Sequence, residues 1–173
     1  EILTKPVKIE VNTNSATVDT IEQSMYYVED KNKPSLLLKI LRENKFDSVI
    51  VFVKTKDRTE DVLYDLQDAG IKCAHIHRNR SQNARQKALK ALKNREVKVL
   101  VATDILSRWI DIESVACVIN YDLPQENETY VHRIGRTARA WKTWISISFA
   151  VEAQREKMNS IIELTGAEIK EIK

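Results

Sequence analysis

Short apolar runs alternate with amphipathic stretches along most of this chain. The run DSVIVFV (47–53) ends in consecutive apolar residues, as in a strand that is buried on both faces of a sheet. The next stretch, TEDVLYDLQDAG (59–70), has apolar residues at helical spacing and ends at Gly70, a residue type that often terminates helices. Repeating this interpretation along the chain predicts strands at 21–29, 47–53, 71–77, 97–103, 115–121 and 145–150, and helices at 34–44, 59–70, 81–94, 127–134 and 151–166.

Strands that alternate with helices at this spacing predict an α/β domain with a mainly parallel sheet. The chain has 173 residues, of which 43% are hydrophobic and 31% charged, which suits one domain with one core. No apolar run approaches the ~18 residues of a membrane span. Cys73 and Cys117 stand alone in apolar runs, so we expect buried free thiols and a cytoplasmic location. The chain begins without Met, so we expect a fragment of a longer protein.

Positive charge is concentrated in one part of the chain. Between Arg78 and Lys98, eight Lys or Arg residues stand against the single acid Glu96, so this segment carries +7 although the whole chain carries only +3. The remainder therefore carries −4. A basic block inside a folded pattern indicates a surface for a polyanion rather than a basic tail.

Polar groups also follow the predicted strands, at the edge where parallel α/β sheets bind ligands. In VATDILSRWID (101–111), hydroxyls and Arg108 suit a phosphodiester, and the carboxylate of Asp111 suits the two hydroxyls of a ribose. The alternative is that Asp104 and Asp111 cap local turns.

The segment TYVHRIGRTARA (129–140) crowds His132, Arg133, Arg136 and Arg139 around Gly135. Arginine binds phosphate oxygens through its planar fork and keeps its charge, so phosphate is the first candidate ligand. A solvated basic helix end with weak surface ion pairs is the alternative.

The basic helix at 81–94 offers a second anion site. Ser81 is its expected N-cap, and Gln82 and Arg85 lie in the first turn, where free N–H groups and the helix dipole favour an anion. A merely solvated face is the alternative. His75 and His77 have no third ligand nearby in the sequence, and we interpret them as structural rather than metal-binding.

Four of these segments, in this order, resemble the motifs of one family. VFVKT (51–55), SQNAR (81–85), VATDILSRWID and HRIGRTAR (132–139) are similar to motifs IV, IVa, V and VI of DEAD-box ATP-dependent RNA helicases, with bacterial RhlE-type helicases nearest. The resemblance covers Ile21 to Gly166 and matches only the C-terminal of the two domains, because nothing resembles the Walker A loop or D-E-A-D strand of the first. It implies a RecA-like three-layer sandwich at 21–173, preceded by a linker or N-terminal extension at 1–20.

The resemblance also implies a role for each motif residue. Arg136 and Arg139 would be arginine fingers that reach the γ-phosphate, Asp111 would hold the ribose, and His132 and Arg133 would support the cleft. The RNA sugar-phosphate backbone would contact Thr55, Gln82, Arg85, Thr103 and Arg108. ATP with Mg²⁺ would be bound mainly by the missing first domain. We expect a monomer that acts with that domain on RNA and not at a membrane.

Glycine is scarce where this family normally uses it. The chain has only 3 Gly, whereas an average usage of about 7% would give roughly a dozen. Six positions that usually hold Gly in the family are instead Arg78, Arg95, Trp109, Ala138, Trp141 and Trp144, which include every Trp of the chain. A Gly codon read as Trp or Arg, a glycine-poor design and a degenerate helicase each explain this. The clustering of Trp favours the first, and the DNA sequence would decide.

Three functions follow from these observations. The leading one is the C-terminal domain of an RNA-stimulated ATPase and RNA helicase, inactive without its first domain. The second is a non-catalytic RNA-binding module derived from such a domain. The third, a RecA-like nucleotide-binding domain unrelated to RNA, leaves the +7 segment unexplained.

Overall fold

The computed structural model describes residues 21–77, 79–104, 115–134, 144–166 and 168–173. Within them, seven strands form one sheet in the order β3-β4-β2-β5-β6-β1-β7, and every pairing is parallel. The strands are β1 (Ile21–Tyr27), β2 (Val49–Phe52), β3 (Cys73–Ile76), β4 (Val99–Ala102), β5 (Cys117–Asn120), β6 (Trp144–Ala150) and β7 (Ile169–Ile172).

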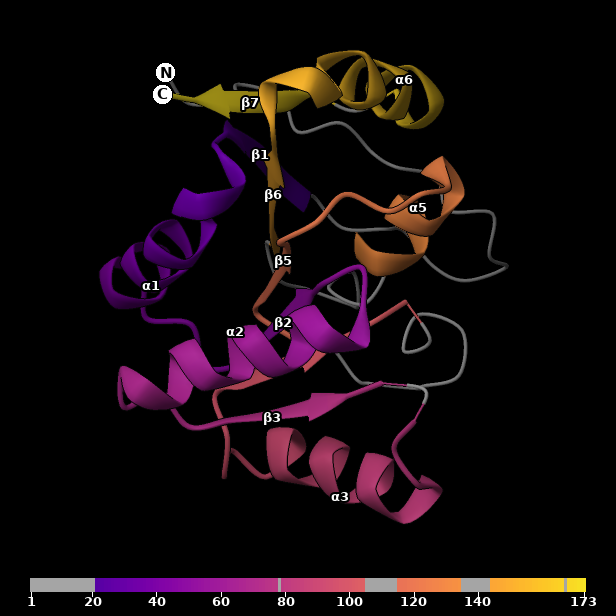
Figure 1. Cartoon of the computed structure of the whole chain (residues 1–173). Coiled ribbons are helices and arrows are strands. Elements are labelled where there is room, and N and C mark those ends of the chain that lie inside the picture. Colours follow the sequence, from indigo (N-terminus) through magenta and orange to yellow (C-terminus); the bar gives the residue numbers. More distant parts are fainter. Residues whose placement is uncertain (1–20, 78, 105–114, 135–143, 167) are drawn as a thin grey trace.

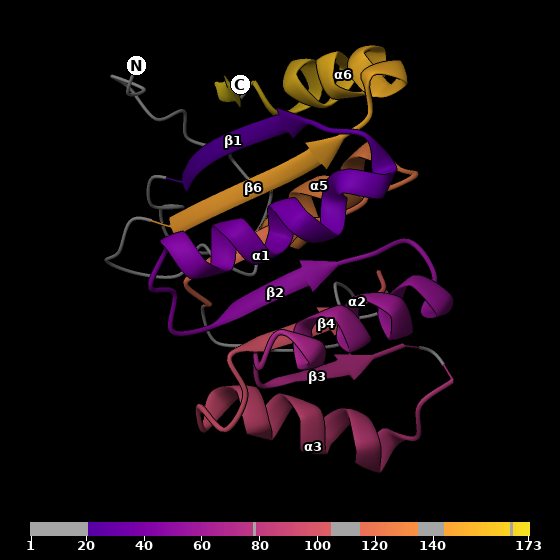
Figure 2. The ribbon, with the colours of Figure 1, turned by 60° about the vertical axis from the view of Figure 1, so that its left-hand side comes forward.

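The helices cover both faces of this sheet (Figures 1 and 2). They are α1 (Lys33–Glu43), α2 (Lys56–Asp68), α3 (Gln82–Lys93), α5 (Asn127–Ile134) and α6 (Arg155–Thr165), with short 3-10 turns η1 (Asp30–Asn32) and η2 (Glu152–Gln154). Helices α1 and α2 pack in one apolar cluster, and α3, α5 and α6 contribute to two clusters on the opposite face. The predicted RecA-like three-layer α/β sandwich is therefore confirmed.

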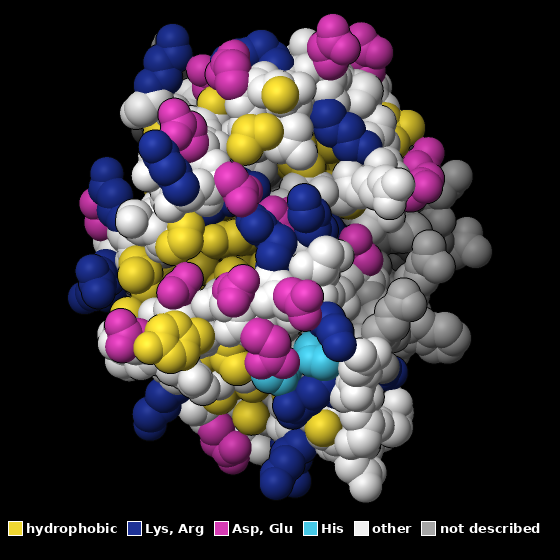
Figure 3. Space-filling model, in the orientation of Figure 1, with side chains coloured by type: hydrophobic (Ala, Val, Ile, Leu, Met, Phe, Trp, Pro, Cys, Tyr) yellow, Lys and Arg dark blue, Asp and Glu magenta, His cyan; other side chains and the backbone are white. Residues whose placement is uncertain are grey.

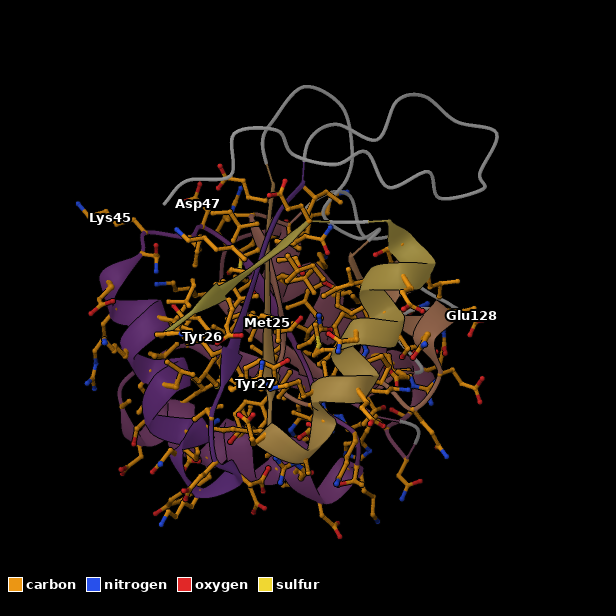
Figure 4. The ribbon with its side chains drawn as sticks, turned by 90° about the horizontal axis from the view of Figure 1, so that it is seen from above. Met25, Tyr26, Tyr27, Lys45, Asp47 and Glu128 are labelled. Atoms are coloured by element: carbon orange, nitrogen blue, oxygen red, sulfur yellow. The ribbon has the colours of Figure 1, made fainter. Side chains whose placement is uncertain are left out.

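The period-two alternation of a strand explains how one sheet contacts both layers. In β2, Val49 and Val51 join the cluster with α1 and α2, whereas Ile50 and Phe52 join the cluster with α3. All four side chains are fully buried, which explains why this strand is a continuous apolar run. In β1, Met25 packs with α6 and Tyr26 with the α1 layer; Figure 4 shows both between these helices.

Several element bounds differ from the sequence-based expectation, and one strand is new. Helix α6 begins at Arg155 rather than Val151, after the turn η2. Helix α2 begins at Lys56 rather than Thr59, because Thr55 supplies the cap. The short strand β7 was not predicted, and it pairs with β1 at the edge of the sheet. Among the described residues, no helix has both the length and the apolar character needed to cross a membrane.

Candidate functional site

The carboxyl ends of four neighbouring strands bring several of the predicted polar residues to one edge of the sheet. Strands β3, β4, β2 and β5 are neighbours in the sheet and run in the same direction. Figure 2 shows the first three of them side by side. Thr103 directly follows β4, Thr55 comes shortly after β2, and Asp122 comes just after β5. Helix α3, with Gln82 and Arg85 in its first turn, follows β3. Residues that are far apart in the sequence thus share the edge where α/β sheets bind ligands.

Thr55 is exposed and caps the start of α2. Its backbone is extended, and its Oγ1 accepts a hydrogen bond from the backbone N–H of Arg58 at 3.2 Å. A hydroxyl has one donor proton in addition to its acceptor lone pairs. The cap therefore leaves the Thr55 proton available to a ligand oxygen, as a phosphate or ribose contact requires.

The first turn of α3 presents donors without competing acids. Ser81 is the N-cap, as predicted, and its Oγ accepts from the N–H of Ala84 at 3.1 Å. Gln82 is exposed, Arg85 is half-buried, and the turn contains no acidic residue. The backbone N–H groups and the dipole at such a helix start favour a bound anion.

Arg133 is a fully buried guanidinium that connects α5 to the ends of β4 and β5. Its Nε donates to Asp104 Oδ1 at 2.6 Å, and its Nη1 donates to Asn120 Oδ1 at 3.2 Å and to the carbonyl of Asp122 at 2.6 Å. Its guanidinium carbon lies 5.1 Å from the ring centroid of Phe52. Burial lowers the pKa of Arg133, and Asp104 opposes that shift. Asp104, for which a turn cap was the alternative, is thus an ion-pair partner of the HRIGRTAR segment.

A second group of charges surrounds Asp122, whose role the sequence did not reveal. Asp122 is 4% exposed, and its carboxylate lies between Lys33 of α1 and Arg58 of α2. Lys33 Nζ lies 3.1 Å from Oδ1, and Arg58 Nε lies 2.7 Å from Oδ2. Both cations also lie within 6 Å of the ring centroid of Tyr121 and contact Asp30. The only sequence signal was that DLPQ (122–125) follows a strand.

The charges of this group reinforce one another. The hydrogen bond from Arg58, followed in weight by those from Lys33, lowers the pKa of Asp30 from 3.8 to about 2, against an opposing effect of burial. Burial alone would lower the pKa of Arg58, but its bonds to Asp122 and Asp30 raise it. Burial raises the pKa of Tyr121. Asp30 and Arg58 therefore stay ionised around neutral pH, and the Tyr121 hydroxyl stays uncharged.

The expectation that no third ligand lies near His75 and His77 was wrong. Glu60 of α2 faces both: its carboxylate oxygens lie 3.8 Å from His75 Nδ1 and 3.3 Å from His77 Nε2. One ligand atom from each residue lies within 4.8 Å of the other two, close enough to consider a metal ion. Figure 3 shows the two imidazoles (cyan) beside acidic and basic side chains.

The outer nitrogens of these imidazoles argue against a metal centre. A metal-bound imidazole usually donates its second N–H to an acceptor. Here Arg80 Nη1 lies 2.8 Å from His75 Nε2, and the backbone N–H of Asn79 donates to His77 Nδ1 at 3.2 Å. A ring nitrogen that accepts from such a donor has no N–H to offer to an acceptor, so neither imidazole makes the outer hydrogen bond that is usual for a metal ligand. The geometry therefore favours the structural interpretation, an imidazole pair beside a carboxylate, and burial also lowers the pKa of His75.

The remaining predicted site residues lie outside what the structure describes. Arg108, Asp111, Arg136 and Arg139 are outside the described residues, and for His132 only the backbone within α5 is described. Their assigned roles stay predictions.

Comparisons with known proteins identify the family of this chain. Residues 32–141 match the helicase conserved C-terminal domain. The chain is 39% identical over 172 residues to the ATP-dependent RNA helicase DbpA of Bacillus subtilis, covering 99% of this chain and 36% of that protein. The chain therefore belongs to the helicase conserved C-terminal domain family, as a DEAD-box C-terminal domain. The RhlE subtype stays a prediction.

Solved structures of DEAD-box proteins share the fold of this chain. A DEAD box protein from the hyperthermophile Methanococcus jannaschii is 38% identical with a TM-score of 0.83, covering 88% of this chain and 42% of that one. Dbp5 of S. cerevisiae bound to RNA and ADP BeF3 is 29% identical with a TM-score of 0.83, covering 94% of this chain and 44% of that one. The chain spans less than half the length of each of these relatives.

Proposed function

We propose that this chain is the second RecA-like domain of an ATP-dependent RNA helicase that melts short RNA duplexes. Arg136 and Arg139 act as arginine fingers on the γ-phosphate, and Asp111 holds the ribose, with His132 and Arg133 supporting the cleft. ATP and Mg²⁺ are held mainly by a first RecA-like domain that this chain does not include. The RNA backbone contacts Thr55, Gln82, Arg85, Thr103 and Arg108.

The carrying observation is the meeting of exposed donors at one edge of the sheet. Thr55 follows β2, and the start of α3 follows β3. Both of these strands pair with β4, so the two groups lie at the same edge of the sheet. Hydroxyl, amide and guanidinium groups suit phosphate and 2′-hydroxyl oxygens, which are the same whatever the base. Dbp5, a structural relative, was solved with RNA, which supports the same ligand class.

The proposed helicase function is tested by joining this chain to the first domain of a DEAD-box helicase and measuring RNA-stimulated ATP hydrolysis. We expect Arg136→Ala or Arg139→Ala to lower turnover by about 10³-fold while nucleotide affinity changes little, because fingers stabilise charge in the transition state. Arg155→Ala is the matched control, since Arg155 pairs with Glu152 and Glu171 on the α6 side. Unchanged turnover in the finger variants would remove the assignment.

The RNA contacts are tested by titrating RNA at several salt concentrations. We expect Arg85→Ala to weaken binding equally for different sequences and to lower the salt slope by roughly one. Lys93→Ala removes the same charge from the other end of α3 and should change the slope less. RNA binding without ATP hydrolysis would favour the non-catalytic RNA-binding module. If the chain does not bind RNA at all, only the third function, a nucleotide-binding domain unrelated to RNA, is left.

Location, domain limits and oligomeric state belong to the same proposal. Cys73 and Cys117 are both free, and burial raises the pKa of Cys73 to about 11, which suits unreactive thiols in a reducing cytoplasm. We propose a linker or extension at 1–20, a domain at 21–173, and a monomer that closes against its first domain when ATP and RNA bind.

A further inference from the structure

The carboxylate of Asp122 is saturated by donors from α1, from α2 and from the turn that precedes α2. Oδ2 accepts from the backbone N–H of Lys54 at 3.0 Å and from Arg58 Nε at 2.7 Å. Oδ1 accepts from Arg58 Nη2 at 2.8 Å and from Lys33 Nζ at 3.1 Å. Each of its two oxygens thus has two partners, about as many as a carboxylate can accept.

Three of these four bonds fix the turn between β2 and α2. Lys54 immediately precedes Thr55, and Arg58 follows it by three residues. The Arg58 backbone N–H donates to Thr55 Oγ1, and the Arg58 guanidinium donates to both carboxylate oxygens of Asp122. Since β5 pairs directly with β2, Asp122 holds the turn that carries Thr55 against the neighbouring strand end.

Stability alone gives a weak reason for such a group. A buried ion pair is expensive to desolvate, and apolar residues of similar volume often stabilise a fold as well or better. A forked guanidinium with a backbone N–H on the same carboxylate instead fixes distance and direction. Geometry is therefore what this arrangement supplies.

We propose that Asp122 is a positioning residue for RNA binding: it sets the place of the Thr55 hydroxyl at the sheet edge without touching RNA itself. This inference rests on the proposed RNA contact of Thr55. Its effect has a distinctive sign. Removing a negative charge should by itself strengthen binding to a polyanion, whereas loss of positioning should weaken it.

The experiment titrates a fluorescent single-stranded RNA with the full 173-residue chain and compares Asp122→Asn, Thr55→Val and the double variant. We expect each single change to weaken binding about fivefold, the equivalent of one lost hydrogen bond. The double variant should bind no more weakly than Thr55→Val alone, because Asp122 acts only through Thr55. A purely structural role for Asp122 would not produce this non-additivity.

Asp30→Asn is the matched control. Asp30 shares the cationic partners Lys33 and Arg58 and loses the same charge, but no bond links it to the Lys54 backbone. Its RNA affinity should stay within about twofold of the unmodified chain. Circular dichroism and thermal unfolding establish that each variant is folded at the titration temperature. If Asp122→Asn does not fold, Arg58→Lys replaces it, since an ammonium keeps the charge but cannot fork onto both oxygens.

The outcomes separate this inference from the proposed function. If Thr55→Val binds RNA normally, the contact assigned to Thr55 is wrong and the positioning role falls with it. If Thr55→Val binds weakly but Asp122→Asn or Arg58→Lys binds normally, the positioning role is wrong and the RNA function stands. Additive losses in the double variant would likewise overturn it.

Discussion

Arg95 shows at the scale of one residue what the missing glycines cost. Its φ is +63°, the only positive value at a non-Gly residue within the described ranges. It follows α3 with the hydrogen bonds of a Schellman cap: Arg95 N–H to Leu92 at 3.2 Å and Glu96 N–H to Ala91 at 2.9 Å. After α2 the same pattern occurs with Gly70 at φ +78°. The family's preference for Gly at position 95 therefore has a conformational cause.

We expect Arg95→Gly to raise the free energy of unfolding by about 0.5–1 kcal/mol. Glycine removes the strain of the left-handed backbone, and this gain exceeds the entropy that it adds to the unfolded chain. Arg95→Ala is the control, because alanine keeps the Cβ that causes the strain. Gly70→Arg should lose a similar amount, since nothing lies within 4 Å of a Cβ built there and only φ opposes it. Urea unfolding at one pH measures all three, and an equal gain for Gly and Ala would contradict the strain argument.

At the scale of elements, the apolar pattern predicted nearly the whole layout but not the contacts between elements. Continuous runs such as 49–53 identify strands because both faces are covered, and Ser81 and Gly70 mark helix ends through local hydrogen bonds. The strand β7 (IKEI) is only partly buried and has no such run, so it gave no signal.

The charged contacts could not be predicted for a different reason. The Asp122 bonds join residues 64, 68 and 89 positions apart, and only the sheet order brings them together. The contact of Glu60 with His75 and His77 could not be predicted for the same reason, because α2 and β3 meet only in the folded chain. Local periodicity contains no information about such pairs. Resemblance to a family identified Thr55 and Arg85, but not what holds them in place.

The start of α1 should show a pH dependence that the Asp30 contacts dictate. The folded pKa of Asp30 is lowered from 3.8 to about 2, chiefly by Arg58, so its ionised form stabilises the fold above the unfolded pKa. That contribution is complete above about pH 5 and is lost as the pH falls through about 4 to 2. The effect is modest because Asp30 is 59% exposed.

Thermal unfolding of the unmodified chain and of Asp30→Asn between pH 2 and 7 measures this contribution. The difference in unfolding free energy should be constant near neutral pH and shrink toward pH 2. A difference that stays constant down to pH 2, or that grows on acidification, would show that Asp30 is not stabilised by Arg58.

At the scale of the whole molecule, the all-parallel sheet explains why the proposed chemistry lies in so few segments. In the sequence, 105–114 follows Asp104 and 135–143 follows α5, and the Asp104–Arg133 ion pair joins these two starting points. Asp111, Arg136 and Arg139, whose roles in nucleotide binding and catalysis are proposed above, belong to these two segments. Three of the six residues at usual glycine positions, Trp109, Ala138 and Trp141, belong to them as well. We therefore expect substitutions in these segments to affect catalysis more than the fold.

Replacing two of these residues by Gly tests whether they affect catalysis rather than the fold. The experiment uses this chain joined to the first domain of a DEAD-box helicase. Trp109 separates Arg108 from Asp111, so a bulky side chain at this position opposes any turn that must aim one residue at RNA and the other at ribose. We expect Trp109→Gly with Ala138→Gly to raise RNA-stimulated ATP hydrolysis at least about tenfold, or about 1.4 kcal/mol of barrier. Stability should change little.

Arg95→Gly is the matched control for that experiment, because Arg95 follows the end of α3 and belongs to neither segment. It should raise stability and leave turnover unchanged, which separates a better-folded enzyme from a better-shaped site. Equal activity before and after the double change, with both proteins folded, would mean that the segment tolerates Trp109. In that case Trp109 and Ala138 do not limit turnover, and these two positions give no support to a degenerate helicase.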